Sequence, residues 1–85
     1  MHELSIALDV CRIAEERVGT DDLPRITAVG LEVGAKAGIE IDNLEFCLEA
    51  LLGNPPFGHA RPVIDRLDGD ELRVTYLEVE DDDGP

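Results

Sequence analysis

A long amphipathic segment near the start of the chain places the first constraint on its fold. Apolar residues recur at helical spacing over residues 3–18, and Gly19 follows directly as a helix stop. A helix with so broad an apolar face needs a second layer to pack against, and 85 residues allow one small domain. The stripe consists of Leu4, Ala7, Leu8, Cys11, Ala14 and Val18, widened by Ile6, Val10 and Ile13.

The middle of the chain predicts one strand and a second helix. Residues 25–33 alternate as a strand does, with Thr27, Val29, Leu31 and Val33 on one face. Asp42, with Glu45 three residues later, resembles a capping box and predicts a helix over residues 43–52 that Gly53 ends.

The last part of the chain predicts two strands joined by a tight turn. Residues 62–67 and 71–79 flank Asp68-Gly69, a dipeptide that favours positive φ in two-residue hairpin turns. The expected fold class is α+β, with two helices on a three-stranded sheet in the order α-β-α-β-β and the last two strands forming a hairpin.

The charge balance excludes several classes of partner. Seven Lys and Arg residues stand against 20 Asp and Glu residues, a net charge of −13. This balance argues against nucleic acid and anionic membranes as partners, because both attract basic surfaces. No apolar run reaches the ~20 residues of a membrane span, and no secretory signal opens the chain. We therefore expect a cytoplasmic protein, either a monomer or a weak dimer.

Residues 1–80 are expected to form one domain. Nine of the acidic residues fall within residues 65–85, and the end of the chain, Asp81-Asp82-Asp83-Gly84-Pro85, reads as an acidic disordered tail over 81–85.

The first three residues, Met1-His2-Glu3, are a candidate metal-binding motif. The Met1 amine, the His2 amide and the His2 imidazole can supply three consecutive nitrogen donors, which form five- and six-membered chelate rings. Such rings suit square-planar Ni(II) or Cu(II). The alternative is an ordinary solvent-exposed histidine near the chain start.

The opening residues resemble the HypA/HybF family of nickel-insertion proteins for [NiFe] hydrogenase. The resemblance rests on ordered segments that cover about 1–55 and 60–80 of this chain. These segments are Met1-His2-Glu3-Leu4-Ser5-Ile6, Val29-Gly30-Leu31-Glu32-Val33-Gly34, Leu44-Glu45-Phe46-Cys47-Leu48-Glu49, Asp70-Glu71-Leu72-Arg73-Val74 and Leu77-Glu78-Val79-Glu80, and Glu40 occupies the family's acidic position.

The resemblance implies a function and a site. The chain would be a nickel-binding accessory protein, or metallochaperone, for hydrogenase maturation. Ni(II) would be held for transfer by the Met1 amine, His2 and Glu3, with Glu40 as a further acidic ligand or supporting group. The implied partners are the hydrogenase large-subunit precursor and the maturation GTPase.

One family feature has no counterpart in this sequence. Family members insert a zinc domain with two C-x-x-C pairs between the last two strands, where this chain has only Leu67-Asp68-Gly69-Asp70-Glu71. We therefore expect a truncated form that binds no zinc. The alternative is a non-catalytic interaction or scaffold module of the same fold that no longer transfers nickel.

The remaining candidate residues favour structural interpretations. His59 is expected on a surface loop, and Cys11 and Cys47 fall on the apolar faces of their helices. The cysteines stand 36 positions apart and form no C-x-x-C pair, so they predict neither a disulfide framework nor a cysteine-based zinc site. No nucleophile stands beside a base in the sequence, so an enzyme is not expected.

Overall fold

Two helices and three strands follow one another in the predicted order over residues 2–80, the part of the chain that the computed structural model describes. Helix α1 (Glu3–Val18) has the predicted bounds, and strand β1 (Ile26–Gly34) is displaced by one residue. The order continues with α2 (Ile41–Leu52), β2 (Arg61–Leu67) and β3 (Leu72–Val79). The tail expected over 81–85 lies outside the described residues, as does Met1.

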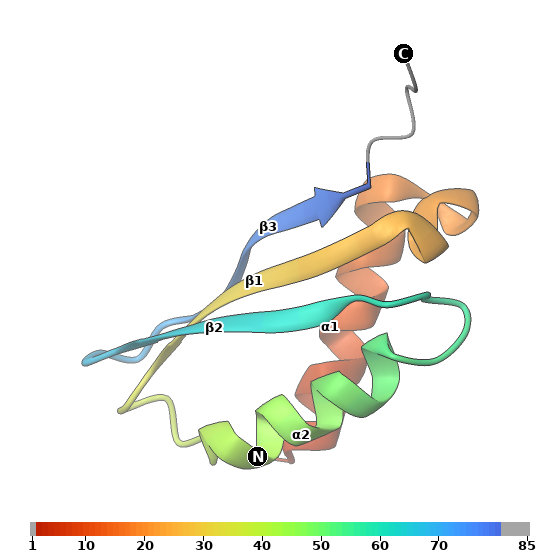
Figure 1. Ribbon diagram of the computed structural model, residues 1–85. Coiled ribbons are helices and arrows are strands. Elements are labelled where there is room, and N and C mark those ends of the chain that lie inside the picture. The colour runs from red at the N-terminus through yellow and green to blue at the C-terminus, as the bar shows by residue number, and fades with distance from the viewer. Residues whose placement is uncertain (1, 81–85) are drawn as a thin grey trace.

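The elements form two layers, which confirms the α+β prediction. Both helices pack on the same side of the sheet, and α1 also contacts α2 (Figure 1). The core between the layers consists of aliphatic side chains and Phe57, as expected from a chain with three aromatic residues. Its largest fully buried members are Leu23, Ile26, Val29, Leu31, Val33, Leu44, Leu48 and Leu52.

The predicted hairpin between the last two strands is wrong. The strand order is β2-β1-β3, so β1 separates β2 from β3. β1 pairs parallel to β2 and antiparallel to β3. It is the most deeply buried strand, with only Thr27 and Glu32 half-exposed, whereas its two neighbours have many exposed residues. The most apolar strand therefore occupies the centre, where both of its edges are hydrogen-bonded.

The segment between β2 and β3 crosses over the end of β1. The backbone amides of Gly34, the last residue of β1, and of the two residues after it donate hydrogen bonds to this segment. Gly34 N–H donates to the Glu71 carbonyl at 2.7 Å, Ala35 N–H to the Leu67 carbonyl at 2.8 Å, and Lys36 N–H to the Gly69 carbonyl at 2.7 Å. A Cβ at Gly34 would overlap the Gly69 carbonyl, so the crossing requires glycine there. Gly69 itself has no positive φ; among residues 2–80 only Gly19 and Gly38 do.

Helix α1 is rotated relative to the stripe that the sequence predicted. Its buried residues are Ile6, Ala7, Val10 and Ala14, while Leu4 and Leu8 are each 52% exposed. The helix contacts the sheet, α2 and the 3₁₀ helix η1 (Thr20–Arg25), which follows Gly19 directly. Ile6 and Val10, expected only to widen the stripe, therefore belong to its packed face together with Ala7 and Ala14.

The sheet face opposite the helices carries polar pairs and one aromatic ring. Arg73 Nε donates to Glu32 Oε1 at 2.6 Å, from β3 to β1. The ring of Tyr76 lies over Gly30, where a Cβ would overlap it. Thr27, predicted on the core face, instead lies at a register shift and donates its hydroxyl to the Glu78 carbonyl at 3.2 Å. Ile26 is the buried residue at this end of β1.

Candidate metal site at the helix N-termini

The first residue of α1 bonds to the start of α2. Glu3 Oε2 accepts the backbone N–H of Glu40 at 3.0 Å, and Glu3 Oε1 accepts the Asn43 side-chain amide at 3.1 Å. We call these two hydrogen bonds the Glu3 bridge. They bring together Glu3 and Glu40, which are 37 positions apart in the sequence. His2 is adjacent because it is covalently joined to Glu3.

The start of α2 differs from the prediction. The helix begins at Ile41, and Glu40, not Asp42, is its N-cap, with an extended backbone (φ −77°, ψ 101°) and no side-chain cap. In a capping box, the acid three residues into the helix would accept the N-cap N–H. Asn43 occupies that position, and Glu3 of the other helix accepts the N–H instead. The Asp42 carboxylate accepts a hydrogen bond from Arg66 Nη2 of β2 at 2.6 Å.

Carboxylates dominate the charge at this end of the molecule. The hydrogen bond from Glu40 N–H lowers the pKa of Glu3, with smaller contributions from its own backbone and from Asn43. Glu3 is therefore held in its ionised form. Arg66 is the nearby cation: its hydrogen bond to Asp42 raises its pKa, as do the charges of Asp42, Glu45 and Glu40. A carboxylate-rich end attracts cations.

His2 is positioned so that its donor groups do not serve the helix. It is the N-cap of α1 (φ −83°, ψ 124°), and the first intrahelical bond runs from Ile6 N–H to its carbonyl at 3.3 Å. The leading N–H groups of a helix have no intrahelical acceptor. The amide of His2 can therefore serve a metal without breaking a helical bond. Neither the exposed His2 imidazole nor the Glu40 carboxylate bonds to another side chain in the described range 2–80.

Within residues 2–80, side chains alone do not form a metal site. Residues 2–80 contain no group of three His, Cys, Asp or Glu side chains close enough to hold a metal ion. A site at the helix N-termini would therefore need main-chain nitrogen donors besides His2 and Glu40. The Met1 amine, which would be one of them, lies outside the described residues.

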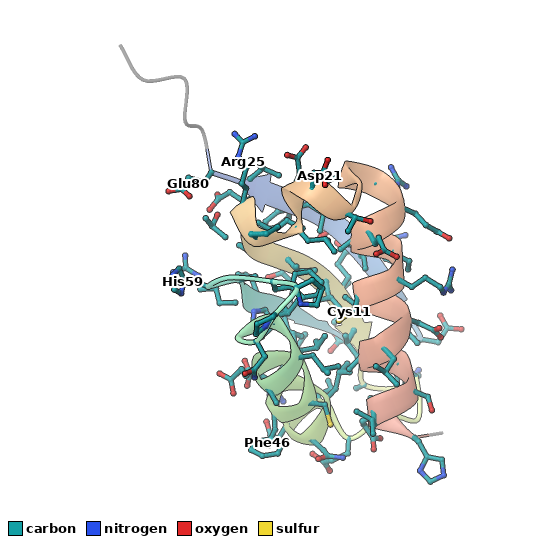
Figure 2. All side chains as sticks on the ribbon, turned by 90° about the vertical axis from the view of Figure 1, so that its right-hand side faces the viewer. Cys11, Asp21, Arg25, Phe46, His59 and Glu80 are labelled. Atoms are coloured by element: carbon teal, nitrogen blue, oxygen red, sulfur yellow. The ribbon has the colours of Figure 1, made fainter. Side chains whose placement is uncertain are left out.

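The other candidates lie apart from the Glu3 bridge. His59 is exposed in the connection that follows α2 (Figure 2). The 12 residues of α2, about 18 Å in length, separate this connection from Glu40 at the start of the helix. Cys11 and Cys47 are both free and half-buried, and each packs against the core from the apolar face of its helix. Burial raises the pKa of the Cys11 thiol, which keeps it protonated.

Residues 1–70 match the family model described as HypA, a metallochaperone of hydrogenase and urease nickel incorporation. The chain belongs to the HypA family. A metallochaperone carries a metal and catalyses no reaction, so this is a family of non-enzymes.

Individual HypA proteins align with the chain over different lengths. The hydrogenase maturation factor HypA of Azotobacter vinelandii is 43% identical over 51 residues, covering 60% of this chain and 45% of the relative. HypA of Geotalea uraniireducens is 39% identical over 113 aligned positions, covering 94% of this chain and all of the relative. Because 113 positions exceed the 85 residues here, part of that relative has no counterpart in this chain. The chain spans about half the length of its Azotobacter relatives.

A solved HypA structure has the same fold. The solution structure of the nickel metallochaperone HypA from Helicobacter pylori superimposes with a TM-score of 0.75 at 15% identity, covering 94% of this chain and 98% of that one. No helix within residues 2–80 is long and apolar enough to cross a membrane.

Three residues around the Glu3 bridge were missed by sequence reasoning. Asn43, Asp42 and Arg66 connect α2 to α1 and to β2 through side-chain contacts. Asn43 and Arg66 carried no pattern signal, and Asp42 was assigned to capping. Their roles follow from contacts in the folded chain, in which Asn43 bonds to Glu3 and Arg66 bonds to Asp42.

Proposed function

We propose that this HypA-family chain binds Ni(II) at the N-termini of α1 and α2 and holds it for transfer to a nickel enzyme, with hydrogenase maturation as its pathway. The observation that supports this most is the Glu3 bridge, which places the Glu40 backbone against the residue next to His2. The nickel ion is the cargo. The ligands are expected to come from Met1, His2, Glu3 and Glu40.

The donor chemistry fits a d⁸ ion. The Met1 amine, the His2 amide nitrogen and the His2 imidazole would occupy three corners of a square plane, with one five-membered and one six-membered chelate ring between them. The amide must lose its proton to bind, so metal binding releases protons. Zn(II), with no preference for a square plane, gains less from this arrangement.

The two carboxylates have different tasks in this proposal. Each oxygen of Glu3 already accepts a hydrogen bond, so Glu3 chiefly holds α2 in position and has only its remaining lone pairs to offer a metal. Glu40 is exposed and its carboxylate is unpartnered by any other described side chain. We assign Glu40 as the side chain that completes or flanks the coordination. Such an open site suits a metal that must be passed on.

We extend the proposal to the zinc content, location, partners and domain organisation of this chain. The chain is a short HypA form, active in the cytoplasm, in which residues 68–71 stand where relatives insert the zinc domain, and it carries no zinc of its own. Its partners are the hydrogenase large-subunit precursor and the maturation GTPase. Residues 1–80 act as one domain.

A second candidate function is a scaffold module that keeps the fold but carries no nickel. It is favoured by the direct crossing of residues 67–71 over β1, which leaves the nickel-binding domain without the added zinc module. Both candidates predict the same fold. They differ in whether the chain has a saturable Ni(II) site.

Calorimetric titration with Ni(II) separates the two functions. The chain with a native N-terminus is expected to bind one Ni(II), and His2→Ala to lose binding while its circular dichroism is unchanged. Residues added before Met1 remove the amine donor, so affinity should fall by about tenfold or more. The matched control is His59→Ala, which removes the other histidine and should bind as the native chain does. Absence of a saturable site, or equal affinity with and without the added residues, would reject nickel carriage.

A further inference from the structure

The outer edge of β3 lies next to a groove and exposes apolar side chains. β3 is an edge strand, and no described segment pairs along its outer side (Figure 1). Three of its residues are exposed large hydrophobic ones: Leu72 at 38%, Tyr76 at 45% and Val79 at 37%. A groove of about 370 Å³ runs between this strand and α1, with Ile6, Val10, Ile13, Leu72 and Val74 among its lining residues. An edge strand beside a helix-lined apolar groove is the usual setting for strand addition.

The backbone of β3 has hydrogen-bonding groups directed away from the sheet at both ends. Glu71 C=O accepts from Gly34 and Glu80 N–H donates to Arg25 C=O, so Glu71 and Glu80 face β1. These groups alternate along a strand, and the register with β1 shifts once between Val74 and Tyr76, where β3 has one extra residue. Because of this shift, Leu72 at one end and Val79 at the other both direct their backbone groups outward. If β3 of a second copy lies antiparallel to this edge, with its Val79 opposite Leu72, the outward donors and acceptors of the two strands are therefore in matching positions.

The sequence of β3 is complementary to itself in that register. A two-fold axis between Thr75 and Tyr76 places Leu72 opposite Val79 and Val74 opposite Leu77 of the second copy. Val74 and Leu77 pack against the core, so these apolar pairs fall on the helix face, continuous with the groove. The same register places Arg73 opposite Glu78 on the other face, twice by symmetry. Cross-strand neighbours of opposite charge attract, and each side chain of an isologous contact is used in both directions.

Both charged residues retain capacity for a second partner. The Arg73 guanidinium contacts one oxygen of Glu32, and its five N–H donors leave others for a second carboxylate. Glu78 Oε1 and the Glu78 carbonyl share the single hydrogen of the Thr27 hydroxyl, each at 3.2 Å, and no other side chain of residues 2–80 bonds to the Glu78 carboxylate. The pairs would thus extend polar contacts that already exist within each chain.

We propose that β3 is a self-pairing edge, through which two copies of this chain join their sheets into one six-stranded sheet with the strand order β2-β1-β3-β3-β1-β2. All four helices then lie on the same face, with the two α1 helices flanking the joined strands. The net charge of −13 on each copy opposes pairing, so the association is expected at physiological or higher salt, where the Debye length is about 8 Å. This inference is independent of nickel binding.

A charge-swap experiment tests the register. Sedimentation equilibrium of the full chain should show the mass rising with concentration from 9.3 kDa toward twice that value. Arg73→Glu and Glu78→Arg each set like charges opposite one another in a homodimer, so each alone should remain monomeric. Mixed in equal amounts, the two variants regain both opposite-charge pairs and should associate as the native chain does. The control Glu49→Arg makes the same charge change on α2 and should leave association unaltered.

A second pair of variants covers the possibility that the swaps disturb the fold. Leu72→Lys and Val79→Lys place a charge at the apolar cross-strand pair without touching Arg73 or Glu78, and each should be folded by circular dichroism and monomeric. The proposal is overturned if the native chain stays at 9.3 kDa at every concentration. It is equally overturned if the lysine variants associate like the native chain, or if the folded swap variants fail to associate when mixed.

Discussion

Glu3 of α1 accepts the backbone N–H of Glu40 at 3.0 Å, so a side chain of one helix satisfies the N-cap of the other. The N-terminal amides of a helix attract negative charge, and here that charge comes from a different element of the fold. The bond couples the placement of α2 to the residue next to His2. The proposed metal site and the packing of the two helices therefore share one contact.

The Glu3 bridge predicts a low pKa for the Glu3 carboxyl. Hydrogen bonds from Glu40 N–H and Asn43 favour the ionised form, so the folded-state pKa lies below that of the unfolded chain. The stability that the bridge provides is present above the unfolded value and is lost as pH falls through the folded value. NMR titration of the metal-free protein should show the low pKa, and Asn43→Ala should raise it. Glu3→Gln should reduce the acid sensitivity of unfolding; a titration of Glu3 at the ordinary value near 4.3 would refute the prediction.

Glu40 should contribute to nickel affinity through its side chain. Glu40→Gln keeps the backbone N–H that bonds to Glu3, so the bridge and the fold should persist. Ni(II) affinity in calorimetry is expected to fall by about tenfold, the order of magnitude seen when a metal site loses a supporting carboxylate. Glu45→Gln is the matched control, because it removes the same charge near Arg66 without adjoining the bridge. Equal losses in the two variants would mean that only the general charge matters.

The sequence predicted the elements better than their neighbours in the sheet. Helix α1 and strand β1 were located by apolar spacing, which local packing preferences determine. The hairpin failed because Asp68-Gly69 is a local signal, whereas strand order depends on where α2 carries the chain. A helix between β1 and β2 brings β2 back parallel to β1, and a connection of four residues can then cross to the free side. The mostly buried strand β1 accordingly lies between β2 and β3, with both of its edges hydrogen-bonded.

The candidate site was only partly accessible to sequence reasoning. The nitrogen donors of Met1 and His2 follow from covalent structure, and Glu40 came from the family resemblance. The roles of Asn43, Asp42 and Arg66 depend on contacts between residues 24 to 40 positions apart, which no local pattern reports. The same applies to the self-complementary register of β3, which has meaning only once its outer edge is known to be free.

Gly30 and Tyr76 should behave as a coupled pair. A Cβ at Gly30 would overlap the Tyr76 ring, and Tyr76 is 45% exposed. Gly30→Ala should therefore cost about 1 to 2 kcal/mol in the native background, the range of moderate overpacking. In a Tyr76→Ala background the same change should cost less, because the ring is gone. Urea unfolding of the four chains gives the coupling directly, and additive effects would show that the ring does not restrict Gly30.

The crossing over β1 provides the sharpest stability test. At Gly34 an added methyl group meets the backbone carbonyl of Gly69, which three neighbouring hydrogen bonds hold in place. Gly34→Ala should therefore lower the free energy of unfolding by about 3 kcal/mol, the upper range of overpacking. Gly69→Ala is the matched control in the same crossing: its Cβ meets the Glu71 carboxylate at 2.8 Å, the flexible end of a side chain that can move aside. Without a positive φ at Gly69, this second substitution should cost well under about 1 kcal/mol. A larger loss at Gly69 than at Gly34 in urea unfolding would mean that residues 68–71 form a strained turn rather than a direct crossing.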